Sequence, residues 1–185
     1  MTKTFVYHWK SASFTGGTLY PLNRLKIRFP VLYDNAVKKY QGREWLMNIT
    51  IPPLRVLWND VIHISLIHPS LIYKTLSDIG FEHHRAWGAL NWFEIPLDDV
   101  SGNSILYRND RDKGDSRIFL DSDFEPVSVD RVRALSSMPE INVKYYRACF
   151  EEKNPPLLWG YAPHLLFNGQ LDVTNYRIFD WREGV

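Results

Sequence analysis

Short runs of β-branched and aromatic residues, each closed by polar or turn-forming residues, recur along the chain and predict β-strands. The first run is Thr4–Trp9 and the last is Tyr176–Trp181. The dipeptide Asn168-Gly169 predicts a tight hairpin of type I′, with both residues at positive φ, leading into residues 170–173. The remaining strands are expected at residues 55–66, 92–97, 104–108, 117–120, 157–161 and 164–167.

Helices are expected where a proline or a capping residue precedes an apolar stretch. Pro30 and Pro69 suit the first helical position, Gly42 and Gly80 suit the stop, and Ser128 suits the N-cap of a third helix. The expected helices cover residues 30–40, 69–79 and 129–135, with a helical turn at residues 21–27. Short strands with helices grouped early predict an α+β fold.

The chain has 185 residues, of which 45% are hydrophobic, so it can bury one core and is too apolar to be mostly disordered. We therefore expect a single domain over residues 1–185. No stretch approaches the ~20 apolar residues that a membrane helix needs, and no apolar signal segment stands at the start. These features predict a cytoplasmic protein that does not contact a membrane. The single cysteine, Cys149, excludes an internal disulfide and a cysteine-built zinc site.

Charge is unevenly spread although the net charge is only +1. Residues 1–60 carry nine Lys or Arg and three Asp or Glu, which gives this third a formal charge of +6. Such a basic region can meet a phosphate-bearing ligand or nucleic acid, although a solvated charged face is the commoner role. The seven Trp, ten Tyr and ten Phe indicate a thick core, a ring-lined cleft, or both.

The six histidines show no metal-site spacing, since no pair has the i, i+4 separation of a metalloprotease helix. His8, His63 and His164 each lie in an expected strand or at its start, so they can converge on one cleft. A structural role remains the commoner one for any single histidine, and we expect no bound metal. Nucleophile-elbow, P-loop and dinucleotide-fingerprint motifs are absent.

Three short segments, taken in chain order, carry a resemblance. Tyr7-His8 lies in the first strand, a middle strand runs into His68-Pro69-Ser70-Leu71-Ile72-Tyr73, and the late apolar strand 164–167 precedes a Gly turn. This order resembles the ADP-ribosyltransferase-like fold. It is most similar to the DNA-targeting ADP-ribosyltransferase toxins and more distantly to the RNA 2′-phosphotransferases. The resemblance implies a split mixed or antiparallel sheet with flanking helices, and NAD as the cofactor.

The resemblance also implies roles for individual residues. His8 takes the place of the histidine that contacts the ribose of NAD, and Tyr73 that of the tyrosine that stacks near nicotinamide. The family has a Glu at the head of the late strand, where this chain has Pro163-His164. A neutral imidazole stabilises an oxocarbenium-like centre poorly, so transfer is expected to be weak or lost. His164 can still orient a nucleophile, which leaves His8 and His164 as the catalytic candidates.

A nucleotide site needs rings for stacking, groups that bond hydroxyls and positive charge near phosphate. Tyr7, Trp9 and Tyr73 are the candidate stacking rings, and Ser65 joins His8 as a candidate hydroxyl contact. Lys10, with Arg24 or Arg43, is the candidate phosphate contact. The alternative for the first strand is that Tyr7 and Trp9 are core rings on one face while His8 points to the other.

Four functions therefore remain open. The first is a divergent ADP-ribosyltransferase-like protein that binds NAD, another nucleotide or a nucleic-acid end. The second is a non-catalytic module that kept the cleft. The third is a protein–protein interaction domain that uses exposed Trp87, Trp92 and Trp159, with no indication of the partner, and a zinc hydrolase is the fourth. Binding of NAD separates the first two from the third, and turnover of NAD separates the first from the second.

Overall fold

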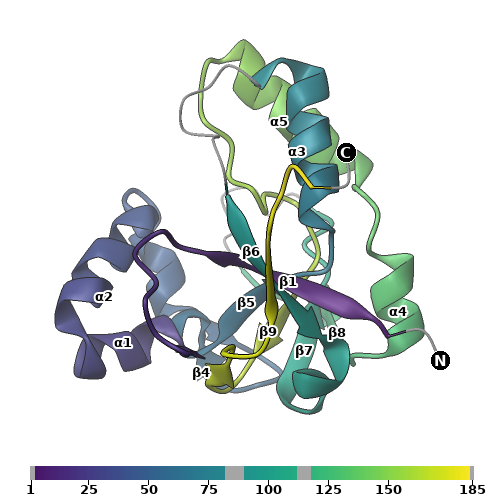
Figure 1. Cartoon of the computed structure of the whole chain (residues 1–185). Helices are drawn as coiled ribbons and strands as arrows, with labels where there is room; N and C mark the ends of the chain where they lie inside the picture. Colours follow the sequence, from purple (N-terminus) through teal and green to yellow (C-terminus); the bar gives the residue numbers. More distant parts are fainter. Residues whose placement is uncertain (1–2, 82–89, 112–117, 184–185) are drawn as a thin grey trace.

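Seven strands of the described chain form one sheet in which every pairing is antiparallel (Figure 1). The computed structural model describes residues 3–81, 90–111 and 118–183. The strands follow the order β11-β6-β1-β5-β9-β7-β8. Their bounds are β1 Phe5–Lys10, β5 Ile62–Ser65, β6 Asn91–Pro96, β7 Ser104–Tyr107, β8 Phe124–Glu125, β9 His164–Phe167 and β11 Arg177–Asp180. Two separate pairs join β2 Thr18–Leu19 to β10 Leu171–Asp172 and β3 Thr50–Ile51 to β4 Val56–Leu57.

Helices flank this sheet, so the predicted α+β class is confirmed. The α-helices are α1 Leu22–Arg28, α2 Pro30–Ala36, α3 Pro69–Ile79, α4 Val129–Ala134 and α5 Glu140–Glu151. Short 3₁₀ segments are η1 Val37–Tyr40, η2 Glu44–Asn48, η3 Trp58–Asp60, η6 Leu97–Asp99, η7 Ser101–Asn103 and η9 Asp121–Asp123. Among the described residues, no helix combines the length and the hydrophobicity that a membrane crossing requires.

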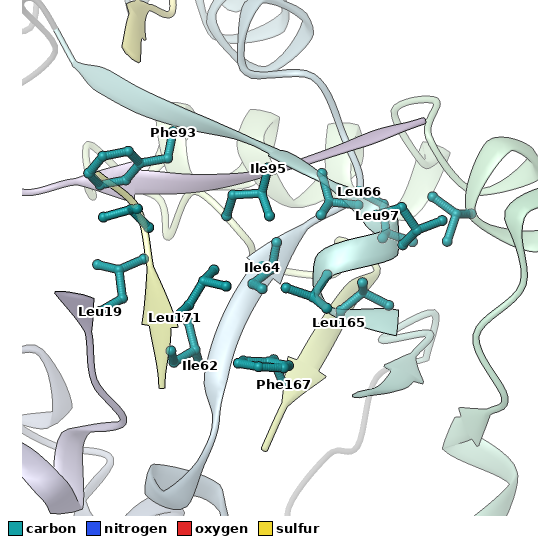
Figure 2. Packing of buried hydrophobic residues seen from close by; sticks show 14 of the residues in the cluster. Leu19, Ile62, Ile64, Leu66, Phe93, Ile95, Leu97, Leu165, Phe167 and Leu171 are labelled. Atoms are coloured by element: carbon teal, nitrogen blue, oxygen red, sulfur yellow. The ribbon is translucent and has the colours of Figure 1, made fainter. Parts of the chain in front are cut away.

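One face of the sheet is covered by a mainly aliphatic core (Figure 2). Ile95, Val6, Ile64 and Leu165 come from the four adjacent strands β6, β1, β5 and β9, and none of them is accessible to solvent. Val132 adds helix α4 to this core. Burying a side chain of this size is worth about 1.5–3 kcal/mol. A shift of register by one residue would expose the whole set, so this core fixes which side chains reach the opposite face.

The opposite face carries two groups of helices. Helices α3 and α5 pack over Tyr7, Trp92 and Phe179. Helices α1 and α2, with η1, instead surround Trp58 and Tyr107. In Figure 1, α1 and α2 lie to the left of the sheet, whereas α3 and α5 lie above it.

The local signals for helix ends are confirmed. Gly42 and Gly80 have positive φ angles of 76° and 112°, a conformation that glycine adopts at little cost. Ser128 accepts a hydrogen bond from the amide of Arg131 as the N-cap of α4. The helix expected at residues 30–40 is α2 followed directly by η1.

The predicted hairpin at Asn168-Gly169 is wrong. Strand β9 pairs with β5 and β7, and β10 pairs with β2, so the two segments flanking the turn do not pair with each other. Neither Asn168 nor Gly169 has a positive φ angle. The amide of Asn168 instead donates to the carbonyl oxygen of Asn103, 2.9 Å away. Pairing between distant strands thus overrides the local turn signal.

Three other predicted strands differ from the structure. The run at residues 55–66 is divided into β4, η3 and β5, because the carboxylate of Asp60 accepts the amide of Leu57 and turns the chain. Residues 157–161 form turns, with Tyr161 at a φ of 56°. Residues 118–120 form no strand, and residue 117 lies outside the described residues.

Helix α5 was not predicted, although the sequence contains its signal. Ile141, Tyr145 and Cys149 recur every four residues after Pro139, which is the spacing of one helix face. Tyr146 is fully buried, and its hydroxyl donates to the carbonyl oxygen of Leu158. This helix therefore anchors the segment that leads into β9.

Candidate functional site

Three histidines from adjacent strands meet where β1 and β5 separate. Strand β1 continues to Lys10 but pairs with β5 only at Tyr7–Ser65. Beyond that pair, Nδ1 of His8 lies 2.8 Å from the backbone carbonyl oxygen of His63. The ring centroids of His63 and His164 are 5.4 Å apart. The convergence of His8, His63 and His164 that their strand positions allowed is therefore confirmed, and we call them the histidine cluster.

Hydrogen bonds to the backbone fix which nitrogen of each ring carries the proton, because a carbonyl oxygen only accepts. His8 donates from Nδ1 to His63, and His63 donates from Nε2 to the carbonyl oxygen of Trp58 at 3.2 Å. His164 donates from Nδ1 to the carbonyl oxygen of Ala162 at 3.0 Å. A neutral imidazole has one N–H, so Nε2 of His8 is a hydrogen-bond acceptor.

Aromatic rings surround the histidine cluster. The ring of Trp58 lies 4.4 Å from that of His63, and the ring of Tyr107 lies 5.1 Å from that of His164. Trp159 lies 6.2 Å from His8 and 6.1 Å from His164, which places it beside two members of the cluster. His164 is almost fully buried, whereas His8 and His63 keep partial solvent access. His8 and His63 are therefore the members of the cluster with appreciable surface open to a ligand.

The environment keeps His8 and His63 neutral. Burial lowers the pKa of His8 to about 4, and the positive charge of Lys39 adds to this effect. Burial also holds the pKa of His63 well below its usual range, and the neighbouring His164 and Lys39 lower it further. At pH 7 the accessible members of the cluster are thus acceptors and do not carry charge.

Lys39 of η1 lies close enough to the cluster for its charge to act on His8 and His63, and Arg43, which precedes η2, lies beside Lys39. The ammonium of Lys39 lies 5.2 Å from the ring centroid of Tyr40, and Arg43 donates from Nη2 to the backbone oxygen of Lys39 at 2.6 Å. Burial and the charge of Arg43 lower the pKa of Lys39. Neither cation makes an ion pair with any residue in the described ranges. Crowded like charges without a counter-ion are typical of a site that accepts an anion.

Two expected stacking residues lie elsewhere. The ring of Tyr7 packs 4.8 Å from that of His68 and lines a cavity of about 210 Å³ with Phe5 and Arg133. Tyr73 lies on α3 with its ring 5.2 Å from that of Trp181. The described contacts of the histidine cluster include neither tyrosine, so the structure does not bring Tyr7 and Tyr73 to His8.

The other expected contacts differ in accessibility. Ser65 is fully buried, and its hydroxyl both donates to the carbonyl oxygen and accepts from the amide of Ile67, so it is committed to the turn after β5. Trp9 is exposed and lies opposite Trp92 in the ladder, and Lys10 ends the same strand. Ser65 is thus unsuited to bind a ligand, whereas Trp9 and Lys10 remain reachable.

The tryptophans expected at an interaction surface are not exposed where the structure describes them. Trp92 is completely buried, and Trp159 is half-buried beside the histidine cluster. Trp87 lies outside the described residues. Trp9 is the exposed tryptophan of the described ranges.

The sequence did not single out several residues that build the site. Trp58, Tyr107 and Lys39 reach it through packing between distant segments, and no local pattern marks them. Within the described ranges, no group of three His, Cys, Asp or Glu side chains is placed to hold a metal ion. The sequence matches no known family model, and no match was found among curated proteins or solved structures.

Proposed function

We propose that the chain is a divergent ADP-ribosyltransferase-like protein whose histidine cluster binds NAD or a similar nucleotide, with transfer activity that is weak or lost. One observation carries this proposal: the acceptor nitrogen of His8 belongs to a ring that feels the charge of Lys39, and neither Lys39 nor the neighbouring Arg43 makes an ion pair with the described residues. A nucleotide supplies the matching groups, namely ribose hydroxyls and phosphates.

Each residue would recognise the part of the nucleotide that suits its chemistry. His8 would accept a ribose hydroxyl through Nε2, since its Nδ1 is already bonded to His63. Lys39 and Arg43 would bind the phosphates, where a planar guanidinium forms two parallel hydrogen bonds. Trp159 offers a partly accessible ring for the base or the nicotinamide. A phosphorylated nucleic-acid end carries the same groups and is the second ligand to test.

Weak transfer is expected because His164, and not a Glu, stands at the head of the late strand β9. Positive charge builds on the ribose in the transition state, and a carboxylate stabilises it far better than a neutral imidazole. The hydrogen bonds of His8 and His63 go to backbone carbonyl oxygens and not to a carboxylate. Each tenfold of rate corresponds to ~1.4 kcal/mol, so a missing carboxylate is enough to leave a binder with little turnover.

The test is calorimetric titration with NAD and with a 5′-phosphorylated oligonucleotide, alongside release of nicotinamide over hours. We expect NAD to bind, and His8→Ala to weaken binding about tenfold, or ~1.4 kcal/mol. His68→Asn is the matched control, because Asn can keep the N-cap of α3 while removing a histidine outside the cluster. Nicotinamide release that is fast and unaffected by His8→Ala would contradict both the role of His8 and the loss of transfer.

A second candidate, an interaction domain, is favoured by a different surface. Ile27 is 85% exposed and Val31 is 73% exposed at the junction of α1 and α2, with Phe29 between them. Exposed apolar residues that gather in one place mark interaction surfaces. If neither NAD nor the oligonucleotide binds, Ile27→Asp should abolish association with the partner that sedimentation or affinity capture with the intact chain then detects.

A further inference from the structure

A second site is suggested by the cavity of about 210 Å³ at the start of β1, away from the described contacts of the histidine cluster. Residues of β1, the N-terminal end of α3, and α4 line it. Its volume is below the ~300 Å³ at which pockets for drug-sized ligands begin. It therefore suits a small molecule, and it is independent of the nucleotide proposal.

The strongest feature of this cavity is the hydroxyl of Tyr7. Tyr7 is only 9% exposed, yet its hydroxyl has no hydrogen-bond partner among the described residues. Burial, and then the charge of Glu94, raises the pKa of Tyr7 to about 12, so the hydroxyl keeps its proton. The hydroxyl itself is not enclosed, so it is open to the cavity and can donate a hydrogen bond to a ligand there.

His68 supplies a second donor beside the first. Its Nδ1 accepts from the amide of Ser70 at 3.2 Å and lies 2.7 Å from the Ser70 hydroxyl. Because an amide only donates, the proton of the neutral ring is on Nε2, which makes no hydrogen bond within the described ranges. The rings of Tyr7 and His68 meet edge to face at 4.8 Å. Two donors without partners thus lie together on one wall.

The remaining lining combines positive charge with apolar surface. Arg133 donates from Nε to the hydroxyl of Thr4 and brings its charge to the rim. The N-terminus of α3 contributes a further positive potential, since helix dipoles favour anions there. Leu71 and Val132 form apolar wall, and no Asp or Glu is among the lining residues. The nearby carboxylate of Glu94 is paired with Arg177 at 3.7 Å.

We propose that this cavity binds a small carboxylate with a short apolar body. The carboxylate oxygens accept from the hydroxyl of Tyr7 and from Nε2 of His68, near the charge of Arg133. The apolar body packs against Leu71 and Val132. A neutral ligand of the same shape lacks the charge that Arg133 and the helix terminus favour.

The experiment uses butyrate and benzoate as probes, with butan-1-ol and benzyl alcohol as uncharged counterparts. Binding to the full chain is followed by NMR through the ring signals of Tyr7 and His68. We expect the carboxylates to bind at least tenfold more tightly than the alcohols. Tyr7→Phe, which removes only the hydroxyl, should weaken butyrate about tenfold, since hydrogen bonds to charged groups are the stronger class.

Arg133→Met and His8→Ala separate this site from the histidine cluster. Arg133→Met should lower butyrate affinity and leave NAD affinity unchanged. His8→Ala should lower NAD affinity and leave butyrate affinity unchanged. Equal affinity for butyrate and butan-1-ol, or a Tyr7→Phe variant that binds butyrate like the parent, would overturn the proposal. Failure of NAD to bind would not affect it, because the two sites share no residue.

Discussion

The imidazole of His8 donates from Nδ1 to the backbone carbonyl oxygen of His63 across 2.8 Å, at the point where their two strands stop pairing. This bond fixes the ring and leaves Nε2 as an acceptor. Burial of the same ring lowers its pKa to about 4. Geometry and protonation therefore agree on a neutral, oriented hydrogen-bond acceptor.

The first prediction concerns stability in mild acid. His8 and His63 have folded-state pKa values below the ordinary value of 6.5, so the unfolded chain binds more protons as the pH falls. Stability should be fully present above about pH 6.5 and fall by ~1.4 kcal/mol per pH unit for each such histidine as the pH drops toward 4. Partial solvent access makes the pKa shift smaller and so shortens the pH range over which stability falls.

Urea unfolding at pH 7.5, 6.0 and 5.0 measures the effect. His8→Asn should flatten the decline between pH 6 and 5, because one of the groups that takes up a proton on unfolding is gone. A parent protein whose unfolding midpoint is constant over this range would show that the histidines are not held neutral.

The second prediction concerns Gly160, which lies between Trp159 and the left-handed Tyr161. A Cβ at Gly160 would overlap the ring of Tyr145, whose hydroxyl accepts the amide of Leu157. Gly160→Ala should cost about 1–3 kcal/mol of unfolding free energy, as overpacking typically does. Gly102→Ala is the matched control, since nothing lies within 4 Å of its Cβ position. Equal unfolding midpoints for the two variants would refute the close packing.

The third prediction concerns a buried carboxylate. Asp123 is 2% exposed and accepts from both Nε and Nη2 of Arg111 at 2.6 and 2.7 Å. Arg111→Met removes the charge that balances it and should lower the unfolding free energy by about 3 kcal/mol. Lys74→Met, which breaks the exposed pair with Asp78, should cost less than about 1 kcal/mol. Chemical denaturation compares the two variants. Similar losses would show that the buried Arg111–Asp123 pair contributes no more to stability than an exposed pair.

The sequence predicted features that depend on neighbouring residues. Pro69 and Gly80 bound α3 because a proline suits the first turn and a glycine suits the left-handed end, whatever the rest of the chain does. The Asn168-Gly169 signal is equally local, but β9 is held between β5 and β7 and cannot form the hairpin. Non-local strand pairing is not encoded in a dipeptide.

Some parts of the candidate site were likewise predictable from the sequence and others were not. Strand placement brought His8 and His164 to one region, because their strands β1 and β9 flank β5 in the sheet. Tyr7, next to His8 in the sequence, packs against His68 instead. The register places Tyr7, Ser65 and His164 in one cross-strand row, so alternation along the strand does not explain why His8 lies in the cluster and Tyr7 does not. His8 reaches the cluster where β1 and β5 stop pairing, a feature that no local pattern marks. Lys39 reaches the histidines through a 3₁₀ turn that no periodicity marks.

The last prediction tests Lys39 against its neighbour Lys38. The charge of Lys39 lowers the pKa of both His8 and His63, whereas the ammonium of Lys38 is bonded to the side chain of Asn35. Lys39→Met should therefore raise the pKa of both histidines, and it should weaken NAD about tenfold through the lost phosphate contact. Lys38→Met removes an equal charge and should change neither the pKa values of the histidines nor the affinity for NAD. NMR titration of the histidines and calorimetry with NAD measure the two effects separately. A rise in the histidine pKa values with NAD affinity unchanged would place Lys39 beside the cluster but outside the ligand site. Identical behaviour of the two lysine variants would remove Lys39 from both.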